Sequence, residues 1–474
     1  MAAEEKDRRL VVVSNRVQVI ARGKRDSSAG GLAVGVGAAL RETGGLWFGW
    51  SGEEVDEPTP VRRFSAGSIS YALMDLTSDE YHYFYETTAN RAIWPLFHYR
   101  LDLASFDSSA YLTYLRVNQR YAEGLLPELK ADDLIWVHDY QLFTLGSELR
   151  RREVKNRIGF FLHIPWPALD VFLAFPWHRQ IAEALCAYDV IGFQTERDRH
   201  HFFEYLEFEK IARRVDEQTV LSSSRMSKVV VEPIGIDYDA FQEMGETKDA
   251  QRLATSVAKS LVGRKLIVGI DRLDYSKGIG QRLESFQAML ASFPETRRET
   301  IYIQISAPSR QNVPEYLRMR EEVEGLAGHI NGRFGEADWV PLRYINRSFN
   351  RRQLSGLFKL ARIGLVTPLR DGMNLVAKEF VAAQDPEDPG VLVLSRFAGA
   401  VAELREGAIV VNPFDTDAVG QALFQGLTMP LEERIERWKA MAGVVKSNDA
   451  AAWSRRFLKI LASNAPAPSV DTAA

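Results

Sequence analysis

Short runs of apolar, mostly β-branched residues alternate along the chain with longer amphipathic stretches. In the first half, the runs are Leu10–Val13, Leu134–Val137, Ile158–Leu162, Val190–Phe193 and Lys228–Val231. In the second half, they are Leu266–Ile270, Ile301–Ile305, Ile363–Val366, Val391–Leu394 and Ile409–Val411. This alternation is typical of parallel strands joined by crossover helices, so the pattern predicts two doubly wound, Rossmann-like α/β sheets.

The chain has 474 residues, which is too many for one hydrophobic core of ordinary size. Between the two series of strands lies a polar stretch, Ile236–Val262, with an amphipathic segment but no strand pattern. We therefore expect a first domain over residues 1–240 and a second over 241–462. Residues 463–474 are rich in Ala, Pro and Ser and are expected to form a disordered tail.

Composition excludes several classes of protein. Hydrophobic residues make up 46% of the chain, charged residues 26%, and the net charge is -4, which favours an ordinary globular protein without a nucleic-acid or membrane partner. The charged start, Met1–Leu10, lacks the apolar stretch of a secretory signal, and the single Cys186 fits a reducing compartment, so we expect a cytoplasmic protein. No His or Cys spacing matches a metal-ligand motif, so neither a metal site nor a cofactor is expected.

Polar residues follow five of the predicted strands. They lie at Ser14–Arg16, His138–Tyr140, His163–Pro165, Arg272–Asp274 and Arg370–Gly372. Ligands of open α/β sheets bind outside the carboxyl ends of the strands, so these residues are expected to line one cleft between the two domains.

Arg272 and Lys277 lie on one predicted strand-to-helix loop. An Arg fork and a Lys point charge together suit the oxygens of a diphosphate. The alternative is ordinary surface charge.

A second loop, from Leu369 to Glu379, also leads from a strand into a predicted helix. Gly372 allows close backbone approach, and a helix that begins near Asn374 would direct its amides at phosphate. Asp371 is then placed to hold sugar hydroxyls and Glu379 to hold ribose hydroxyls. The alternatives are a helix cap for Asp371 and a helix-dipole partner for Glu379.

Three further features have two interpretations each. The glycine turn at Ser27–Ala33 could approach a phosphate or be a simple tight turn. His163 could contact a ligand or be a structural histidine. Asp139 and Asp371 could also be the paired carboxylates of a glycosidase.

The most specific segments are Val13–Arg16, Ala29–Leu32, Gly45–Gly52, Trp94–Arg100, Arg272–Gly278 and Pro368–Glu379. Taken together, and in this order, they resemble segments of the trehalose-6-phosphate synthases, retaining glucosyltransferases of glycosyltransferase family 20 with the two-domain GT-B fold. The resemblance runs from about Arg9 to Leu461. It implies transfer of glucose from a nucleoside diphosphate glucose, expected to be UDP-glucose, to glucose 6-phosphate.

The resemblance also implies roles for single residues on the donor side. Arg272 and Lys277 would neutralise the diphosphate, and His163 and Asp371 would hold the transferred glucose; these four are the expected catalytic residues. Glu379 would bind the ribose. Further donor contacts would come from Gly31, Met373, Asn374 and Leu375.

On the acceptor side, the resemblance implies that Arg16, Tyr85, Trp94 and Arg310 surround the phosphate of glucose 6-phosphate. Asp139 would hold the acceptor hydroxyls. In such retaining enzymes, the acceptor hydroxyl attacks from the face that the nucleotide leaves, so no carboxylate nucleophile is needed. Catalysis would then rest on positioning and on stabilising the charge of the leaving phosphate.

One departure from the family pattern lies near the expected acceptor phosphate. The family usually has Phe-Ser-Asn where this chain has Thr88-Ala89-Asn90, and Arg91 adds a cation. Two alternatives therefore stay open: another phosphorylated acceptor, as in glucosylglycerol phosphate or pseudo-disaccharide phosphate synthases, and a sugar-phosphate sensor without activity. The sequence also leaves open the base of the donor, UDP, GDP or ADP, and a homodimeric or homotetrameric state.

Overall fold

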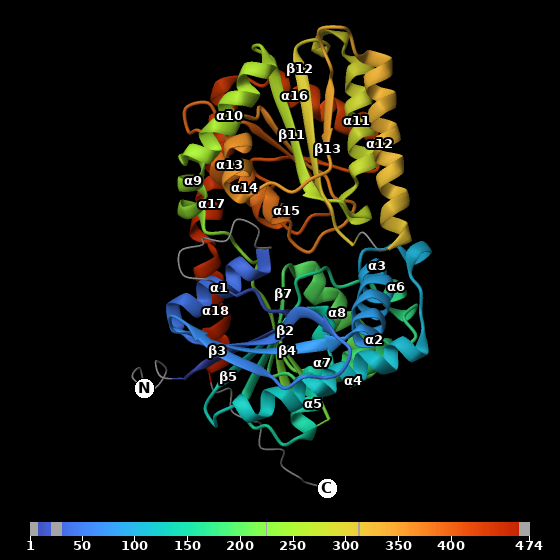
Figure 1. Cartoon of the computed structure of the whole chain (residues 1–474), viewed down its shortest axis with the longest axis vertical. Coiled ribbons are helices and arrows are strands. Elements are labelled where there is room, and N and C mark those ends of the chain that lie inside the picture. The colour runs from blue at the N-terminus through green and yellow to red at the C-terminus, as the bar shows by residue number, and fades with distance from the viewer. Residues whose placement is uncertain (1–7, 20–30, 224, 311–312, 464–474) are drawn as a thin grey trace. The chain divides into compact units, whose positions relative to one another are not determined.

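The computed structural model describes residues 8–19, 31–223, 225–310 and 313–463 and divides the chain into two units (Figure 1). Unit 1 consists of Met1–Ile234 and Ala450–Ala474, and unit 2 of Gly235–Asp449. The predicted tail over 463–474 lies outside the described residues except for Ser463.

Unit 1 contains a ten-stranded sheet in the order β3-β4-β2-β1-β5-β6-β7-β10-β9-β8. The pairs from β4 to β10 are parallel, and β3, β9 and β8 add antiparallel edges. The strands are β1 (Leu10–Arg16), β2 (Gly45–Val55), β3 (Arg62–Ala66), β4 (Ile69–Thr77), β5 (Leu134–His138), β6 (Arg157–Phe161), β7 (Val190–Phe193), β8 (Arg213–Arg214), β9 (Thr219–Ser222) and β10 (Arg225–Val231).

The helices of unit 1 cover this sheet. They are α1 (Gly31–Thr43), α2 (Ser78–Glu80), α3 (Trp94–Phe97), α4 (Ser108–Leu125), α5 (Leu145–Arg151), α6 (Leu169–Leu173), α7 (His178–Leu185), α8 (Glu196–Phe208) and α18 (Ala450–Ala462), with a π-helix, η2 (Tyr81–Ile93). Capping side chains fix several starts: Asp107 and Thr195, for example, accept bonds from backbone amides of α4 and α8. Since β5 and β7 are buried along their whole length, they read as continuous apolar runs.

Unit 2 contains a six-stranded, fully parallel sheet in the order β13-β12-β11-β14-β15-β16. Its strands are β11 (Lys265–Arg272), β12 (Thr300–Ala307), β13 (Leu342–Ile345), β14 (Ile363–Val366), β15 (Val391–Ser395) and β16 (Ile409–Val411). Its helices are α9 (Tyr238–Gly245), α10 (Lys248–Leu261), α11 (Ile279–Ser292), α12 (Pro314–Phe334), α13 (Arg351–Leu360), α14 (Leu375–Ala383), α15 (Val401–Leu404), α16 (Thr416–Thr428) and α17 (Leu431–Ser447). Figure 1 shows the sheet between a helix group with α10 and α13 and another with α11 and α12.

The predicted α/β class with two Rossmann-like sheets is confirmed, because each of the ten apolar runs falls on a strand. The pattern does not predict β2, β3, β4, β8, β9 or β13. The strand β2 carries glycines and two glutamates, and β3 is largely exposed, so neither reads as a buried apolar run.

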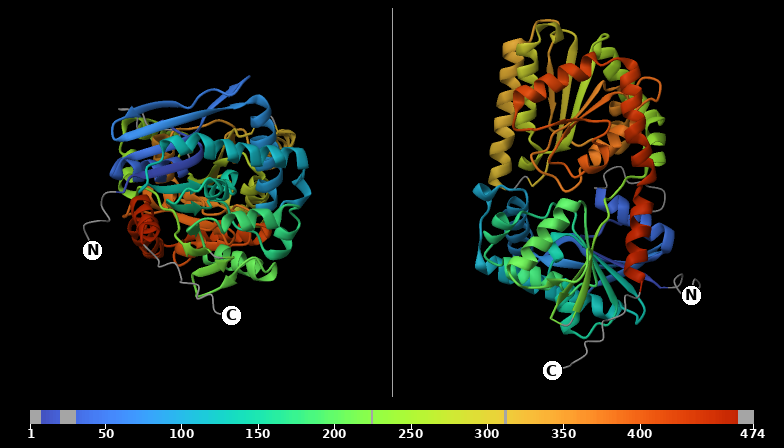
Figure 2. Two further views of the ribbon diagram at one scale, coloured as in Figure 1. Left: turned by 90° about the horizontal axis from the view of Figure 1, so that it is seen from below. Right: turned by 180° about the vertical axis from the view of Figure 1, so that it is seen from behind.

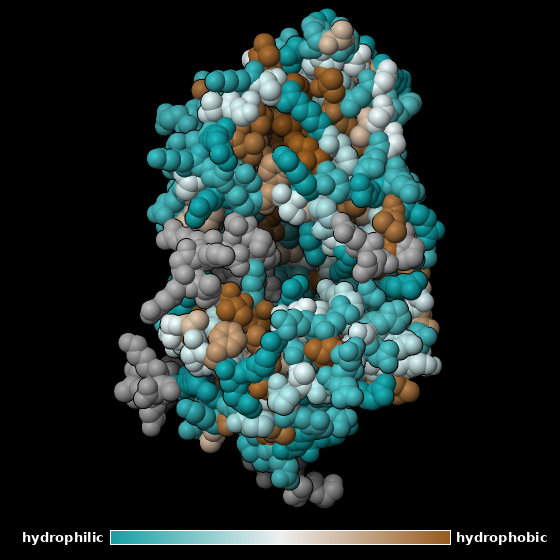
Figure 3. All heavy atoms as spheres, viewed as in Figure 1, coloured by the Kyte–Doolittle hydropathy of each residue, from teal (hydrophilic) through white to brown (hydrophobic). Residues whose placement is uncertain are grey.

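The face of each unit drawn in Figure 3 is mostly hydrophilic, with hydrophobic residues in smaller groups.

The expected second domain, 241–462, needs one correction: α18 belongs to unit 1. Figure 2 shows it, in red, beside the blue α1. Phe457 of α18 stacks on Trp136 of β5 at 4.8 Å between ring centroids. A Cβ atom at Gly159 or Gly192 would lie 2.8 Å from the Phe457 ring, so these glycines make room for the helix.

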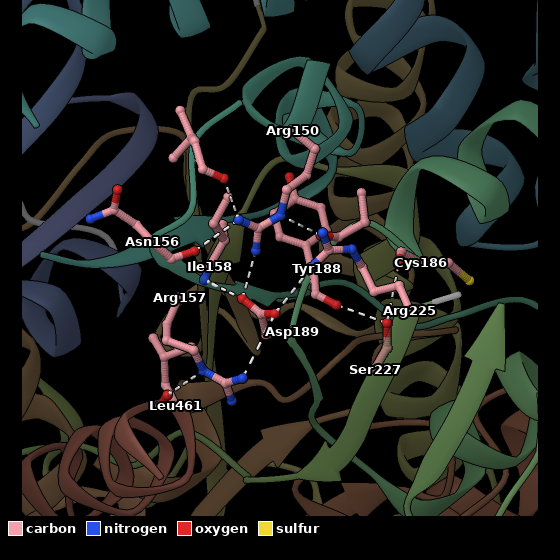
Figure 4. A network of polar contacts seen from close by, with 12 residues as sticks. Arg150, Asn156, Arg157, Ile158, Cys186, Tyr188, Asp189, Arg225, Ser227 and Leu461 are labelled. Atoms are coloured by element: carbon pink, nitrogen blue, oxygen red, sulfur yellow. Dashed lines mark hydrogen bonds and ion pairs between the residues drawn. The ribbon is translucent and has the colours of Figure 1, made fainter. Parts of the chain in front are cut away.

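A polar network connects the end of α18 to the start of β6 (Figure 4). Arg157 donates to the carbonyl oxygens of Leu461 at 3.1 Å and Ser463 at 3.2 Å. Its guanidinium also lies 3.8 Å from the Asp189 carboxylate, which accepts a bond of 2.7 Å from Arg150. Arg157 therefore satisfies carbonyl groups that the helix end leaves without partners.

Candidate active site

Each unit places its candidate residues at the point where the strand order reverses. In unit 2, the chain leaves β11 toward β12 and later crosses to β14 on the other side, and in unit 1, it leaves β1 toward β2 and crosses to β5. Open α/β sheets bind ligands at the carboxyl ends of such neighbouring strands. Strand β11 ends at Arg272, and the loops after β11 and β14 contain Leu273–Gly278 and Thr367–Asn374. In unit 1, β1 ends at Arg16 and Asp139 follows β5.

In unit 2, the structure brings three predicted donor-site residues together. Lys277 Nζ donates to Asp371 Oδ2 at 2.5 Å, and Asn374 Nδ2 donates to the same oxygen at 3.0 Å. The exposed fractions of the Lys277 and Asp371 side chains are 10% and 14%, so water screens this ion pair weakly. The surface-charge alternative therefore fails for Lys277, whereas Arg272 is exposed at the end of β11.

The two loops also touch through their backbones. Leu369 N–H donates to the Ser276 carbonyl at 2.8 Å. Gly278 has a φ of +62°, and a Cβ atom there would lie 2.8 Å from the Thr367 carbonyl oxygen. Glycine is thus required both by the backbone conformation and by the close approach of the neighbouring loop.

Helix α14 begins where the sequence predicts. Asn374 is its N-cap, with Oδ1 accepting from Ala377 N–H at 3.4 Å, so the helix-cap alternative for Asp371 is wrong. Met373 is buried, and Leu375 is the first helical residue. The N-terminal amides and the positive end of the helix dipole thus lie beside Lys277 and Asp371, a combination that suits an anionic group.

Glu379 forms an ion pair with a residue that the sequence did not single out. Arg351, the first residue of α13, donates to Glu379 Oε1 at 2.9 Å. Burial raises the pKa of the Glu379 carboxyl, and the Arg351 charge opposes that rise. If Glu379 has only a structural role, that role is therefore the ion pair with Arg351 and not an interaction with the helix dipole.

Arg310, expected at the acceptor phosphate, is tied to the loop after β11. Its guanidinium donates to Asp274 Oδ2 at 3.1 Å and to the hydroxyl of Tyr316, which itself donates to Asp274 Oδ2 at 2.9 Å. Asp274 also accepts from Ser276 N–H at 2.9 Å and so starts the 3₁₀ turn Tyr275–Lys277. Arg310 lies in unit 2 and Arg16 in unit 1, so a phosphate shared by the two stays a prediction.

In unit 1, Arg16 and Tyr85 are placed against the same indole. The Arg16 guanidinium lies 5.7 Å from the Trp50 ring centroid, and the Tyr85 ring lies 5.9 Å from the Trp50 ring. A Cβ atom at Gly52 would lie 2.6 Å from Arg16 Nε. The Gly45–Gly52 motif therefore shapes the surroundings of Arg16, and the exposed cation is available to an anion.

Tyr85 and Arg91 lie on η2, and Trp94 follows its end. A π-helix of 13 residues is unusual, and π-helical turns are frequent at functional sites. The buried Trp94 stacks on His98 with ring centroids 4.1 Å apart and lies 5.8 Å from the Tyr140 ring. The residues Thr88-Ala89-Asn90, which differ from the family pattern, are buried in η2, so the difference affects the packing of this helix.

Asp139 and His163 also meet. The backbone of Asp139 has a φ of +76°, which is uncommon for residues other than glycine. Its Oδ1 accepts a hydrogen bond from the His163 backbone N–H at 3.2 Å. The His163 ring forms a bond of 3.1 Å with Nδ1 of His138. Burial lowers the pKa of His163 to about 3, and burial with the neighbouring ring lowers the pKa of His138 well below its ordinary value. Both rings are therefore neutral near pH 7, and one donates to the other.

The remaining donor candidate is less fully described. Gly31 is the first residue of α1, and the preceding Ser27–Gly30 lie outside the described residues. Among the residues described, no group of three or more His, Cys, Asp or Glu side chains could hold a metal ion. Within the same residues, no helix is long and apolar enough to cross a membrane.

A family model, glycosyltransferase family 20, matches residues 8–463. The chain belongs to this family. A trehalose-6-phosphate synthase of Sinorhizobium fredii is 49% identical over 456 residues, covering 96% of this chain and 98% of the relative. Because family 20 consists of glycosyltransferases, the interpretation of Asp139 and Asp371 as the paired carboxylates of a glycosidase is set aside.

Two solved structures add ligands to the comparison. The α,α-trehalose-phosphate synthase (UDP-forming) of Burkholderia xenovorans in complex with glucose-6-phosphate is 44% identical, with a TM-score of 0.91 over 96% of this family 20 chain and all of its own. An E. coli structure bound with UDP-2-fluoro glucose is 44% identical, with a TM-score of 0.92 over 97% of this chain and all of its own. The two-sheet architecture of this family 20 chain is therefore that of GT-B trehalose-phosphate synthases.

Proposed function

We propose that this chain transfers glucose from a nucleoside diphosphate glucose, expected to be UDP-glucose, to glucose 6-phosphate. The products are α,α-trehalose 6-phosphate and the nucleoside diphosphate. Support comes from membership in family 20 and from the glucose-6-phosphate and UDP-2-fluoro glucose bound by similar structures. The observation that carries the proposal is the buried cluster of Lys277, Asp371 and Asn374 beside the start of α14.

On the donor side, Lys277 and Arg272 bind the diphosphate, and the amides at Met373, Asn374 and Leu375 add neutral donors. We assign the carboxylates of Asp371 and Glu379 to hydroxyls of the glucose and the ribose, and we assign Gly31 and His163 to donor binding. A fixed cation in a poorly hydrated site stabilises the charge that grows on the leaving phosphate more strongly than a cation in water.

On the acceptor side, Arg16, Tyr85, Trp94 and Arg310 hold the phosphate, and Asp139 holds sugar hydroxyls. The bond from the anomeric carbon to the diphosphate oxygen breaks while a bond from that carbon to the acceptor hydroxyl oxygen forms on the same face. The acceptor proton passes to the departing phosphate oxygen. Because the neutral, buried His163 and His138 are poor bases, we assign them to binding and positioning, not to proton removal.

The decisive experiment offers glucose 6-phosphate with UDP-, GDP- or ADP-glucose, measures nucleotide release and identifies the sugar product by NMR. We expect trehalose 6-phosphate and a loss of about a hundredfold in kcat for Lys277→Met. Lys265→Met is the matched control, because Lys265 lies at the opposite end of β11 and donates to the Leu427 carbonyl. The same donors are also offered with other phosphorylated acceptors. Nucleotide release only with one of those would refute the assigned acceptor, and no release with any acceptor would refute the transfer.

A homodimer or homotetramer remains part of the proposal. Size measurement by light scattering, with and without substrates, tests it.

A further inference from the structure

Arg282 is a fully buried cation directly behind the loop that carries Lys277. It is the fourth residue of α11, and none of its side chain is exposed. Its Nη1 donates to Asp271 Oδ2 of β11 at 2.7 Å. A buried ion pair of this kind adds little net stability, because desolvation offsets the attraction. A structural role alone therefore gives little reason to keep a charge here.

The other donors of the same guanidinium reach the two loops of the donor site. Nη2 donates to the backbone carbonyl of Lys277 at 3.1 Å, and Nε donates to Thr367 Oγ1 at 3.2 Å. Lys277 ends the 3₁₀ turn after β11, and Thr367 directly follows β14. One rigid, planar group thus connects the two strand ends at which the sheet order reverses.

The surroundings of Arg282 are built to hold the guanidinium in one place. Nη1 also donates to Gln304 Oε1 at 3.2 Å, and Tyr302 donates to the same oxygen at 2.5 Å. A Cβ atom at Gly269 would lie 3.0 Å from Arg282 Nη1 and 2.6 Å from the Tyr302 hydroxyl oxygen. A glycine in the middle of β11 therefore provides the space that this network occupies.

We propose that Arg282 is a positioning residue for the transfer, because its guanidinium fixes the loop of Lys277 relative to the loop of Asp371. The inference rests on the proposed contact between Lys277 and the departing diphosphate. Displacing a catalytic group by about 1 Å can lower the rate a hundredfold. Lysine can carry the charge of Arg282 but cannot reproduce the fork that reaches Asp271, Lys277 and Thr367 together.

Two variants test the inference, and both are compared at equal amounts of folded protein. Arg282→Lys should lower kcat about thirtyfold while the acceptor KM stays within twofold of wild type. Thr367→Val removes one hydroxyl without leaving a charge unpaired and should lower kcat about fivefold with little change in Tm. The control is Arg434→Lys, a buried arginine of unit 2 that bonds Asp388 and the Pro389 carbonyl; it should change Tm but not kcat.

The deciding measurement repeats Arg282→Lys in a Lys277→Met background. If Arg282 acts through Lys277, the second substitution should change kcat less than threefold in that background. An equal loss in both backgrounds would overturn the inference, as would a normal kcat for both Arg282→Lys and Thr367→Val. Failure of the proposed function would look different, because Lys277→Met alone would then keep the wild-type kcat.

Discussion

Replacing His138 with Gln should make the protein less sensitive to acid. The His138 and His163 rings lie 3.1 Å apart at their bonded nitrogens and pack against Trp136, Phe161 and Trp453. Protonating either ring would place a charge among aromatic groups beside a second imidazole. The folded chain therefore keeps both rings neutral well below the pH at which a free histidine becomes charged.

The sign follows from which state binds more protons. In the unfolded chain, both imidazoles titrate near pH 6.5, whereas His163 in the folded chain titrates at about 3 and His138 is also lowered. Stability from this pair is therefore complete above about pH 6.5 and is lost as the pH falls toward the folded-state values. His163 should remove about 2 kcal/mol of unfolding free energy between pH 6.5 and 5, and His138 adds to this loss in the same direction.

Urea unfolding at pH 7 and pH 5 measures this loss. The free energy of unfolding of the wild type should fall further than that of His138→Gln over this interval. His329→Gln is the matched control, because it replaces an exposed histidine of α12 that lies outside the His138–His163 pair. An equal fall for wild type and His138→Gln, or an NMR titration of His163 near pH 6.5, would refute the reasoning.

Two other substitutions separate the parts of the site, and a third tests the attachment of α18. Arg310→Ala should raise the acceptor KM far more than the donor KM, and equal effects would contradict the assignment of Arg310 to the acceptor. Arg351→Met leaves Glu379 without its ion-pair partner and should raise the donor KM about tenfold with an unchanged acceptor KM, as initial-rate kinetics would show. Arg157→Ala removes two bonds to the last carbonyls of α18 and should cost about 1–3 kcal/mol of local stability, seen as faster hydrogen exchange in α18; unchanged exchange would contradict this role.

The parts of the fold that depend on local pattern were predictable from sequence. Strands buried on both faces read as apolar runs, and the residues after them were identified as candidates because parallel strands present their carboxyl ends together. The start of α14 near Asn374 was predicted because the segment from Leu369 to Glu379 follows a strand and leads into a helix.

The parts of the fold that depend on contacts between residues far apart in the chain could not be predicted from sequence. Arg351 and Glu379 are 28 positions apart, and no local spacing links a helix start to a carboxylate in another helix. Helix α18 follows unit 2 in the chain, so a domain boundary drawn along the sequence assigns this helix to the wrong domain. Gly159 and Gly192 lie within apolar strands, and such glycines are a sign that another element approaches closely.

Arg282 left a clearer sign in the sequence. It shares a helical face with Ile279, Leu283 and Phe286, all buried, at the spacing of an amphipathic helix. A charged residue on an apolar stripe must find a partner, because an unpaired buried charge is costly. The sequence does not say which partner, since Asp271, Thr367 and the Lys277 carbonyl come together only when β11 and β14 lie side by side.

Under the proposed function, the pairing of Lys277 with Asp371 makes recognition of phosphate and sugar interdependent. In the proposed donor complex, the diphosphate competes with Asp371 for the Lys277 ammonium, and the glucose hydroxyls and Asn374 donate to the Asp371 carboxylate. In that proposal, a nucleoside diphosphate without glucose brings no sugar hydroxyls to the Asp371 carboxylate and places an anion near it. Asp371→Asn should therefore weaken binding of UDP-glucose about tenfold and leave binding of UDP unchanged or tighter, as calorimetric titration would show. Equal weakening for both ligands would mean that Asp371 serves only to hold Lys277.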